Sequence, residues 1–307
     1  MSGMDDAAAS GASGPVTGSP SDTSATLNLH IDVVGDGPPL VLLHGWAMHG
    51  GVFAPLLERL RQHHTVHVVD LPGHGLSQHS GIALTLEASV ATIAAQVPVA
   101  PWCGWSLGGL VALHAAATRP QRLQGLVMLC ASPRFVRDAP VDAVDAGAGH
   151  ASDPWRFGMS AEIFRDFASG LRGDYRGTLD RFIALEAFGS DDARGELRAL
   201  RGEVFARGEP AAHVLADGLE LLETSDLRGA LPTLAVPSLW IAGRRDRLVD
   251  PRAMRIAADS VQASPSHYVV IEHGGHAPFL THADEVAACI DAFTATCRRD
   301  AGEDASR

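Results

Sequence analysis

The stretch WCGWSLGGLVALHAA at residues 102–116, in which Ser106 stands among glycines, constrains the fold more than any other part of the sequence. The apolar residues before Ser106 are typical of a short buried strand, and those after it of a helix. A serine at such a strand-to-helix turn needs small neighbours, because larger side chains two positions away would collide with the strand or the helix. The turn exposes the hydroxyl, and the first amides of the helix point toward it. A nucleophilic serine is therefore predicted, although a Gly-rich helix start with a capping serine has the same pattern.

Strand-like and helix-like segments alternate on both sides of this turn. Strands are expected at residues 27–35, 40–45, 65–75, 98–105, 123–132, 236–243 and 267–275. Helices are expected at residues 52–62, 85–97, 107–120, 251–261 and 285–299. A chain of 307 residues, 46% of them hydrophobic, is long enough to bury a large core. The alternation predicts an α/β fold with a mostly parallel central sheet and helices on both faces.

The region between residues 134 and 228 departs from this alternation. It contains no convincing strand, and its helix-like segments are residues 160–171, 178–188 and 191–207. We therefore expect a helical cap at 134–228, inserted between two core segments at 27–133 and 229–297.

Both ends of the chain are expected to lie outside this core. Residues 1–26 are rich in Ser, Gly, Ala, Asp and Thr, which predicts a disordered tail, and residues 298–307 are expected to form a C-terminal tail. The first 26 residues have neither a basic start nor a long apolar run, so no signal peptide or membrane span is predicted. We expect a cytoplasmic monomer.

Net charge and residue usage exclude several classes of function. The formal net charge is −12 and no basic tail is present, which argues against a general nucleic-acid binder. All 24 positively charged residues are arginines, so a P-loop lysine, a Schiff base and a lysine-anchored pyridoxal phosphate are excluded. The scattered cysteines predict neither a zinc site nor a disulfide framework; they are Cys103, Cys130, Cys289 and Cys297. We expect chemistry without a metal or a cofactor.

Two further groups complete a catalytic triad with Ser106. Asp246 follows the predicted strand that ends in WIAG, and His276 follows the next one, in VIEHGGHAPF. Their order along the chain, Ser, acid, His, is the order of the fold in which such serine turns occur. Because the carboxyl ends of parallel strands meet at one edge of a sheet, we expect all three side chains there. His276 would take the serine proton, and Asp246 would hold the imidazole tautomer.

Each of these two loops contains an alternative residue. Asp250 is a second acid, but Pro251 and the predicted helix after it favour an N-cap or loop role for Asp250. His273 is a second histidine, but the two glycines before His276 leave that loop freer to turn the His276 ring inward. We favour Asp246 and His276.

The His44-Gly45-Trp46 corner ends the first buried strand and predicts an oxyanion hole. The amides of Trp46 and Leu107 would converge on a carbonyl oxygen as it becomes negative. The Trp46 side chain could be a core aromatic, but its position beside the serine turn predicts that it also forms part of the wall of an acyl site.

The chain resembles the α/β-hydrolase superfamily from about Leu27 to Cys297, through HGW, DLPGHGLS, GWSLGG, GRRDRLV and GGHAPF in that order. It resembles more closely the family of pimeloyl-acyl-carrier-protein methyl ester esterases of biotin synthesis, through VLLHGW, VDLPGHGLS, GWSLGGLVA, RFIALEAFG, GLELLETSDLR and HAPFLTH. The resemblance implies the triad and oxyanion hole named above, and a substrate carried on acyl carrier protein. It also implies an acyl pocket that includes Phe182, Ile183, Ala184, Leu185 and Glu186. Glu186 stands where the family usually has glutamine.

Arginines in the predicted cap are candidates for docking that acidic carrier. Arg194, Arg198 and Arg201 share one helix face, whereas Glu196 and Glu203 lie toward another. Arg176 and Arg181 are expected to extend the face. Such a face either docks an acidic carrier protein or is a solvated surface with local ion pairs.

Other functions remain compatible with the sequence. The same triad serves broad-specificity esterases and C–C bond hydrolases. A ligand-binding receptor with this fold and no turnover is a further alternative.

Overall fold

A computed structural model describes residues 28–138 and 154–304. Its centre is a seven-stranded sheet in the order β1-β3-β2-β4-β5-β6-β7. The strands are β1 Ile31–Val34, β2 Pro39–Leu43, β3 Thr65–Val69, β4 Ala100–Trp105, β5 Leu123–Leu129, β6 Ser238–Gly243 and β7 Ser266–Ile271. All neighbouring strands run parallel except β1, which pairs antiparallel with β3 at one edge. The predicted mostly parallel sheet is confirmed; the predicted tail at residues 1–26 lies outside the described residues.

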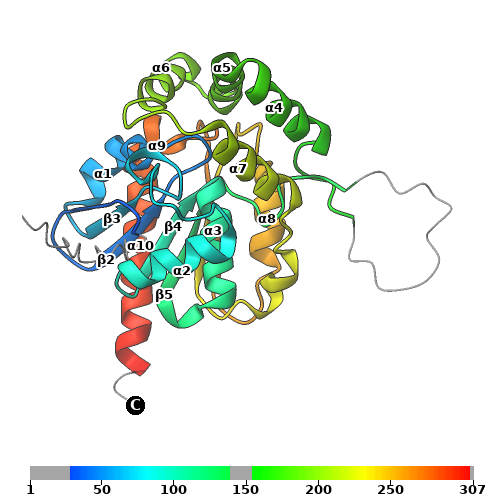
Figure 1. The fold of residues 1–307 in the computed structure, drawn as a ribbon. Coiled ribbons are helices and arrows are strands. Elements are labelled where there is room, and N and C mark those ends of the chain that lie inside the picture. The colour runs from blue at the N-terminus through cyan, green and yellow to red at the C-terminus, as the bar shows by residue number, and fades with distance from the viewer. Residues whose placement is uncertain (1–27, 139–153, 305–307) are drawn as a thin grey trace, which may run out of the picture.

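The core helices cover both faces of this sheet (Figure 1). They are α1 Ala54–Leu60, α2 Leu86–Gln96, α3 Leu107–Thr118, α8 Pro251–Asp259, α9 Pro278–Thr281 and α10 Ala283–Asp304. Short 3₁₀ turns lie at Gly50–Phe53, Gly75–Ser77, Pro120–Arg122 and Arg228–Thr233. Helix α1 packs on α10, and α2 packs on α3. No helix among the described residues is both long and apolar enough to cross a membrane.

Helix α10 corrects the predicted C-terminal boundary. It continues to Asp304, so residues 298–304 are helical rather than part of a tail. Most of these residues are charged and none is proline, and charged side chains do not by themselves end a helix.

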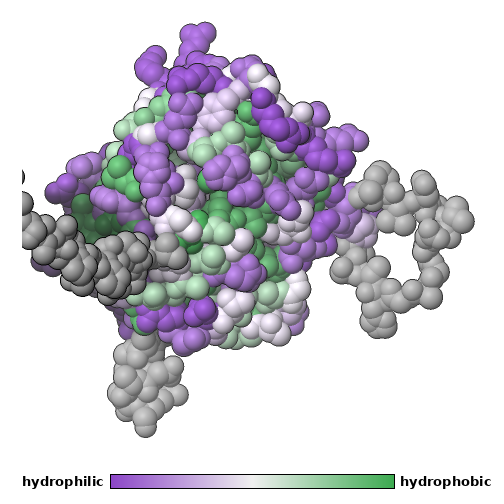
Figure 2. All heavy atoms as spheres, viewed as in Figure 1, coloured by the Kyte–Doolittle hydropathy of each residue, from purple (hydrophilic) through white to green (hydrophobic). Residues whose placement is uncertain are grey.

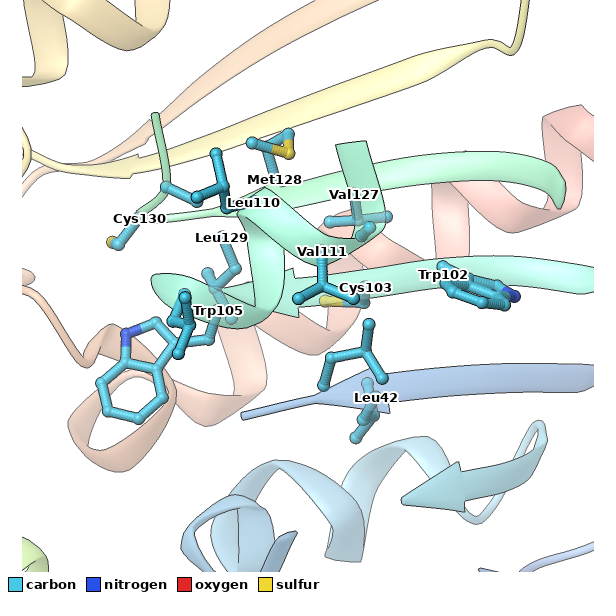
Figure 3. Packing of buried hydrophobic residues seen from close by; sticks show 14 of the residues in the cluster. Leu42, Trp102, Cys103, Trp105, Leu110, Val111, Val127, Met128, Leu129 and Cys130 are labelled. Atoms are coloured by element: carbon cyan, nitrogen blue, oxygen red, sulfur yellow. The ribbon is translucent and has the colours of Figure 1, made fainter. Parts of the chain in front are cut away.

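The core is densest around β4 and α3. Every residue of β4 is buried, as expected for a central strand between two layers of helices. Leu110 and Val111 of α3 pack with Cys103 of β4 and with Val127 and Met128 of β5 (Figure 3). Burial raises the pKa of the Cys103 thiol to about 12, so this cysteine packs as a small apolar side chain. A rigid strand and a rigid helix therefore meet at the turn that carries Ser106.

The predicted helical cap is present above the sheet (Figure 1). Its helices are α4 Ala161–Gly173, α5 Tyr175–Ala187, α6 Ala193–Glu203 and α7 Ala212–Thr224. Hydrophilic residues cover its outer side, at the top of the view in Figure 2.

The cap is joined to the core at both its ends and in the middle. The amide of Leu227, near the end of the cap, donates to the carbonyl oxygen of Pro133, just before the cap begins, at 2.9 Å. After α6, Arg207 pairs with Asp70 at 3.2 Å and with Asp32 at 2.7 Å. Asp70 is fully buried, and removing its partner would leave a buried charge uncompensated.

Candidate active site

Ser106 sits on a strained turn between β4 and α3. Its φ of 52° and ψ of −117° make it one of three non-glycine residues with positive φ in the described part of the chain. A Cβ on Gly104 would lie 2.2 Å from the Gly108 carbonyl oxygen, and one on Gly108 would lie 2.3 Å from that of Leu43. Both positions therefore require glycine, which confirms the reason given for the pattern. Strain of this kind persists where the surrounding structure holds it, often at functional sites.

Asp246 and His276 meet in the loops after β6 and β7. Their Oδ2 and Nδ1 atoms are 2.8 Å apart. The other carboxylate oxygen, Oδ1, accepts the amides of Leu248 at 2.8 Å and Val249 at 2.9 Å. These three hydrogen bonds fix the orientation of the carboxylate, and the His276 Nδ1–H points at it. The His276 Nε2 atom is buried and has no hydrogen-bond partner within the described residues, so it is free to accept a proton.

Trp105 ties the His276 loop to the turn at Ser106. Its indole Nε1 donates to the carbonyl oxygen of His276 at 2.8 Å, and the two ring centroids are 5.6 Å apart. Because Trp105 directly precedes Ser106, the structure brings all three predicted triad residues to one edge of the sheet.

The two alternative residues lie elsewhere. Asp250 is the N-cap of α8: it accepts the amide of Arg252 at 2.8 Å and pairs with its guanidinium. His273 is exposed and pairs with Asp191 at 2.8 Å. Neither is bonded to His276 or Ser106 in the described part of the chain.

The His44-Gly45-Trp46 corner lies beside Ser106. A Cβ on Gly45 would be 3.2 Å from the Ser106 Cβ. The amides of Trp46 and Leu107 donate to no other backbone group among the described residues. Leu107 begins α3, where amides lack intrahelical partners. Two donors are thus available near the Ser106 side chain, as an oxyanion site needs.

His44 holds this corner in place. Its Nδ1 donates to the Gly45 carbonyl oxygen at 2.8 Å, and its Nε2 accepts the Leu71 amide at 2.9 Å. Burial, with the nearby His74, lowers the pKa of His44 to about 3. His44 is therefore neutral and both of its nitrogens are occupied, which suits a positioning role.

The Trp46 side chain reaches from the corner into the cap. The indole is fully buried and donates from Nε1 to the Leu215 carbonyl oxygen of α7 at 2.8 Å. Its ring lies edge-on to Phe182 of α5, with centroids 4.4 Å apart. Trp46 is thus a buried aromatic that joins the corner to the cap helices.

The predicted acyl-pocket run is only partly turned inward. Phe182, Ile183 and Glu186 are buried, and Leu185 is half-buried. Ala184 is exposed, because a helix turns about 100° per residue and a continuous run cannot face one side. Within this run, positions i, i+1 and i+4 of α5 are the buried ones.

Glu186 is a buried carboxyl without a partner. Both of its oxygens are inaccessible and lack a hydrogen bond within the described residues. Burial raises the pKa of Glu186 well above its usual 4.5, and the nearby Asp246 and Glu196 raise it further. Burial therefore favours the protonated, neutral form of Glu186.

Glu196 of α6 is a second buried carboxyl that the sequence did not identify as part of the site. Its Oε1 accepts hydrogen bonds from Ser190 Oγ at 2.6 Å and from Thr281 Oγ1 of α9 at 2.8 Å. A Cβ on Gly275, next to His276, would be 3.5 Å from the unpartnered Oε2. Burial raises the pKa of Glu196 despite these two hydrogen bonds. The only feature of the sequence that indicated an inward position for Glu196 was its place on the side of the predicted helix away from the arginine face.

The predicted docking arginines divide into two groups. Arg201 binds both oxygens of Asp180 on α5, Arg176 pairs with Glu209 at 3.0 Å, and Arg181 pairs with Asp174 at 3.7 Å. Arg194 and Arg198 pair with no acid among the described residues. Only these two retain an unneutralised charge on that face.

The described residues contain no group of three or more His, Cys, Asp or Glu side chains arranged to hold a metal ion.

Comparisons with known proteins identify the family. The profile of the family described as alpha/beta hydrolase fold matches residues 38–283. A pimeloyl-acyl-carrier-protein methyl ester esterase from Xanthomonas campestris pv. campestris is 56% identical over 267 residues, covering 87% of this chain and 99% of the relative. One from Stenotrophomonas maltophilia is 53% identical, covering 87% of this chain and 96% of the relative.

Solved structures share the fold at low sequence identity. An esterase from Exiguobacterium antarcticum has a TM-score of 0.70 at 18% identity, covering 87% of this chain and 95% of its own. An enol-lactonase from Burkholderia xenovorans has a TM-score of 0.69 at 22% identity, covering 86% and 95%. The chain therefore belongs to the alpha/beta hydrolase family and, within it, to the family of pimeloyl-acyl-carrier-protein methyl ester esterases.

Proposed function

We propose that this chain hydrolyses the methyl ester of a pimeloyl chain carried on acyl carrier protein, releasing methanol and a free carboxylate, in biotin synthesis. The observation that carries the proposal is the 56% identity to an esterase of that name, over 99% of the relative's length. That span includes the cap as well as the core. The strained turn at Ser106 and the Asp246–His276 pair support it independently.

The proposed first half-reaction forms an acyl-enzyme. A serine hydroxyl alone is a poor nucleophile, so the His276 Nε2 accepts the proton as Ser106 Oγ attacks the ester carbonyl. Asp246 holds the ring and stabilises its cation. The amides of Trp46 and Leu107 donate to the carbonyl oxygen as it becomes negative. His276 then gives the proton to the departing methanol.

The second half-reaction releases the product. Water gives a proton to His276 Nε2 and attacks the acyl carbonyl, and the Ser106–acyl bond breaks as the proton passes to Ser106 Oγ. The products are the free carboxylic acid, which ionises, and the original enzyme. The proton taken from Ser106 leaves with methanol and a proton from water replaces it, so the enzyme is regenerated without a metal or redox group.

The cap supplies the proposed acyl wall. Trp46, Phe182 and Ile183 present apolar surface, as a hydrocarbon chain requires. A protonated Glu186 offers both a donor and an acceptor, as the glutamine usual in the family does. Its neutral state is therefore what lets glutamate occupy this position.

The proposed partner is the acidic acyl carrier protein, and Arg194 and Arg198 are the proposed docking residues. Their charges are free to attract an acidic surface, whereas those of Arg176, Arg181 and Arg201 are satisfied within the cap. We place the enzyme in the cytoplasm as a monomer.

The decisive test compares the pimeloyl-carrier methyl ester with p-nitrophenyl acetate as substrates. We expect a much higher kcat/KM on the carrier-bound ester, and loss of both activities in Ser106→Ala. Equal or better use of p-nitrophenyl acetate would identify a broad esterase. Hydrolysis of neither ester by folded protein would favour a C–C bond hydrolase or a receptor.

A further inference from the structure

A pocket rich in arginine opens beside the loop that carries Asp246. It encloses about 480 Å³, within the range of small-molecule sites. Its walls come from the chain on either side of residues 139–153, the loop after β6 and the start of α8. The arginines that line this arginine pocket are Arg137, Arg156, Arg244, Arg245, Arg247 and Arg252.

Three of these arginines are neutralised by neighbours. Arg244 pairs with Glu272 at 2.7 Å and Arg252 with Asp250 at 2.6 Å. Arg245 pairs with Asp191. These side chains shape the pocket without adding free charge to it.

The other three, Arg137, Arg156 and Arg247, are exposed and pair with no acidic side chain in the ranges 28–138 and 154–304. Besides Asp250, the only acid among the described residues that line the pocket is Asp246, whose oxygens already bind His276 and the loop amides. Among these described residues, three guanidinium groups against one carboxylate leave a surplus of about two positive charges.

The wall that carries Arg137 and Arg156 is held by backbone pairing. The Arg137 amide donates to the Met159 carbonyl oxygen at 3.1 Å, and the Asp138 amide to that of Trp155 at 2.8 Å. The Phe157 ring also lies 5.7 Å from the Arg252 guanidinium. The two arginines therefore project from fixed positions, which lowers the entropic cost of binding a ligand between them.

We propose that the arginine pocket binds a small phosphate-bearing anion. A phosphate monoester or inorganic phosphate carries nearly two negative charges at neutral pH and matches the surplus. Its three oxygens suit several guanidinium forks at once, whereas one carboxylate would satisfy fewer. The phosphodiester of the carrier's pantetheine arm has a single charge and matches less well. The pocket borders the proposed triad at Asp246, but none of its three unpaired arginines takes part in the ester chemistry proposed at Ser106.

Calorimetric titration with inorganic phosphate, and separately with pyrophosphate, at low ionic strength tests the proposal. The pocket variant is Arg137→Gln/Arg156→Gln/Arg247→Gln. Its matched control, Arg119→Gln/Arg172→Gln/Arg298→Gln, removes three exposed arginines that likewise pair with no acid in the described residues. We expect saturable binding to the wild type and the control, and binding at least about tenfold weaker in the pocket variant, a change of about 1.4 kcal/mol.

Three outcomes would overturn the proposal: no saturation with the wild type, equal weakening in the control, or undiminished binding in the pocket variant. If the triple variant does not fold, the single variant Arg247→Gln is titrated in its place. An affinity of Arg247→Gln for phosphate equal to that of the wild type would contradict the proposed site. Ser106→Ala should bind phosphate as the wild type does, so loss of esterase function and loss of anion binding are separately visible. A pocket variant that loses only carrier-bound ester hydrolysis would assign the surface to the carrier protein instead.

Discussion

The indole nitrogen of Trp105 lies 2.8 Å from the carbonyl oxygen of His276, so the residue before the proposed nucleophile holds the loop of the proposed base. Trp105→Phe removes this hydrogen bond and leaves a buried carbonyl unpaired, which costs roughly 1–3 kcal/mol of stability. Because the His276 ring loses its support, we expect kcat to fall about tenfold on any ester, with KM little changed.

Trp240→Phe is the matched control for this prediction. Trp240 is also fully buried and donates from its indole, to Ser238 Oγ at 3.1 Å, within β6. Loss of this hydrogen bond in Trp240→Phe should lower the urea midpoint of unfolding without lowering kcat. Equal kcat losses in the two variants would show that Trp105 acts only through stability.

The two acids of the β6–α8 loop should differ sharply in their effect on turnover. Asp246→Asn removes the acceptor that fixes the His276 tautomer, so we expect kcat to fall by on the order of 10⁴-fold. Asp250→Asn keeps a good N-cap and loses only an exposed ion pair, so activity should stay within about twofold. Steady-state kinetics on p-nitrophenyl acetate measures kcat for both variants. A larger loss in Asp250→Asn than in Asp246→Asn would make Asp250 the triad acid.

Glu186 should make stability depend on pH. Its folded-state pKa is raised by burial, so the unfolded chain ionises first as pH rises above about 4.5. Unfolding then releases a proton, and the free energy of unfolding falls by up to about 1.4 kcal/mol per pH unit until the folded-state pKa is passed. Glu186→Gln lacks this loss, so its stability relative to the wild type should grow with pH.

Urea unfolding at about pH 5 and about pH 8 measures this difference. Glu220→Gln, at an exposed position of α7, is the control for the loss of one carboxyl group. A constant difference for Glu186→Gln would mean that Glu186 is ionised in the folded protein.

Carrier docking should depend on Arg194 and Arg198 together. Arg194→Glu/Arg198→Glu replaces attraction by repulsion, so kcat/KM on the carrier-bound ester should fall at least about tenfold while p-nitrophenyl acetate hydrolysis changes little. Added salt should narrow the difference in kcat/KM between the wild type and this variant on the carrier-bound ester, because exposed charges are screened over roughly 8 Å at physiological ionic strength. The same double reversal at Arg119 and Arg298, exposed on the core, should have little effect. Parallel losses on both substrates would indicate damage to the cap.

The core was predictable because its signals are local. The glycines around Ser106 and the alternation of apolar segments specify the turn, the sheet and the loops that carry Asp246 and His276. The cap was harder, because its inner face depends on how α5 and α6 lie on the core. Spacing alone shows neither the burial of Glu196 against Thr281 nor the Arg201–Asp180 pair between helices. A run taken from a motif likewise does not show which of its residues face inward, and the exposure of Ala184 beside the buried Phe182 and Ile183 follows from the helical turn.

The hydrogen bond between Leu227 and Pro133 closes the cap into a module whose two ends meet. An insertion with adjoining ends can be exchanged or resized without shifting the strands that flank it. Bond-breaking chemistry and ester selection can therefore evolve at different rates in this chain. Such an exchange must also respect the pairs between cap and core: Arg207 belongs to the cap and Asp70 to the core, so a transplanted cap must bring its own cation for Asp70. At this buried charge the two modules have to change together.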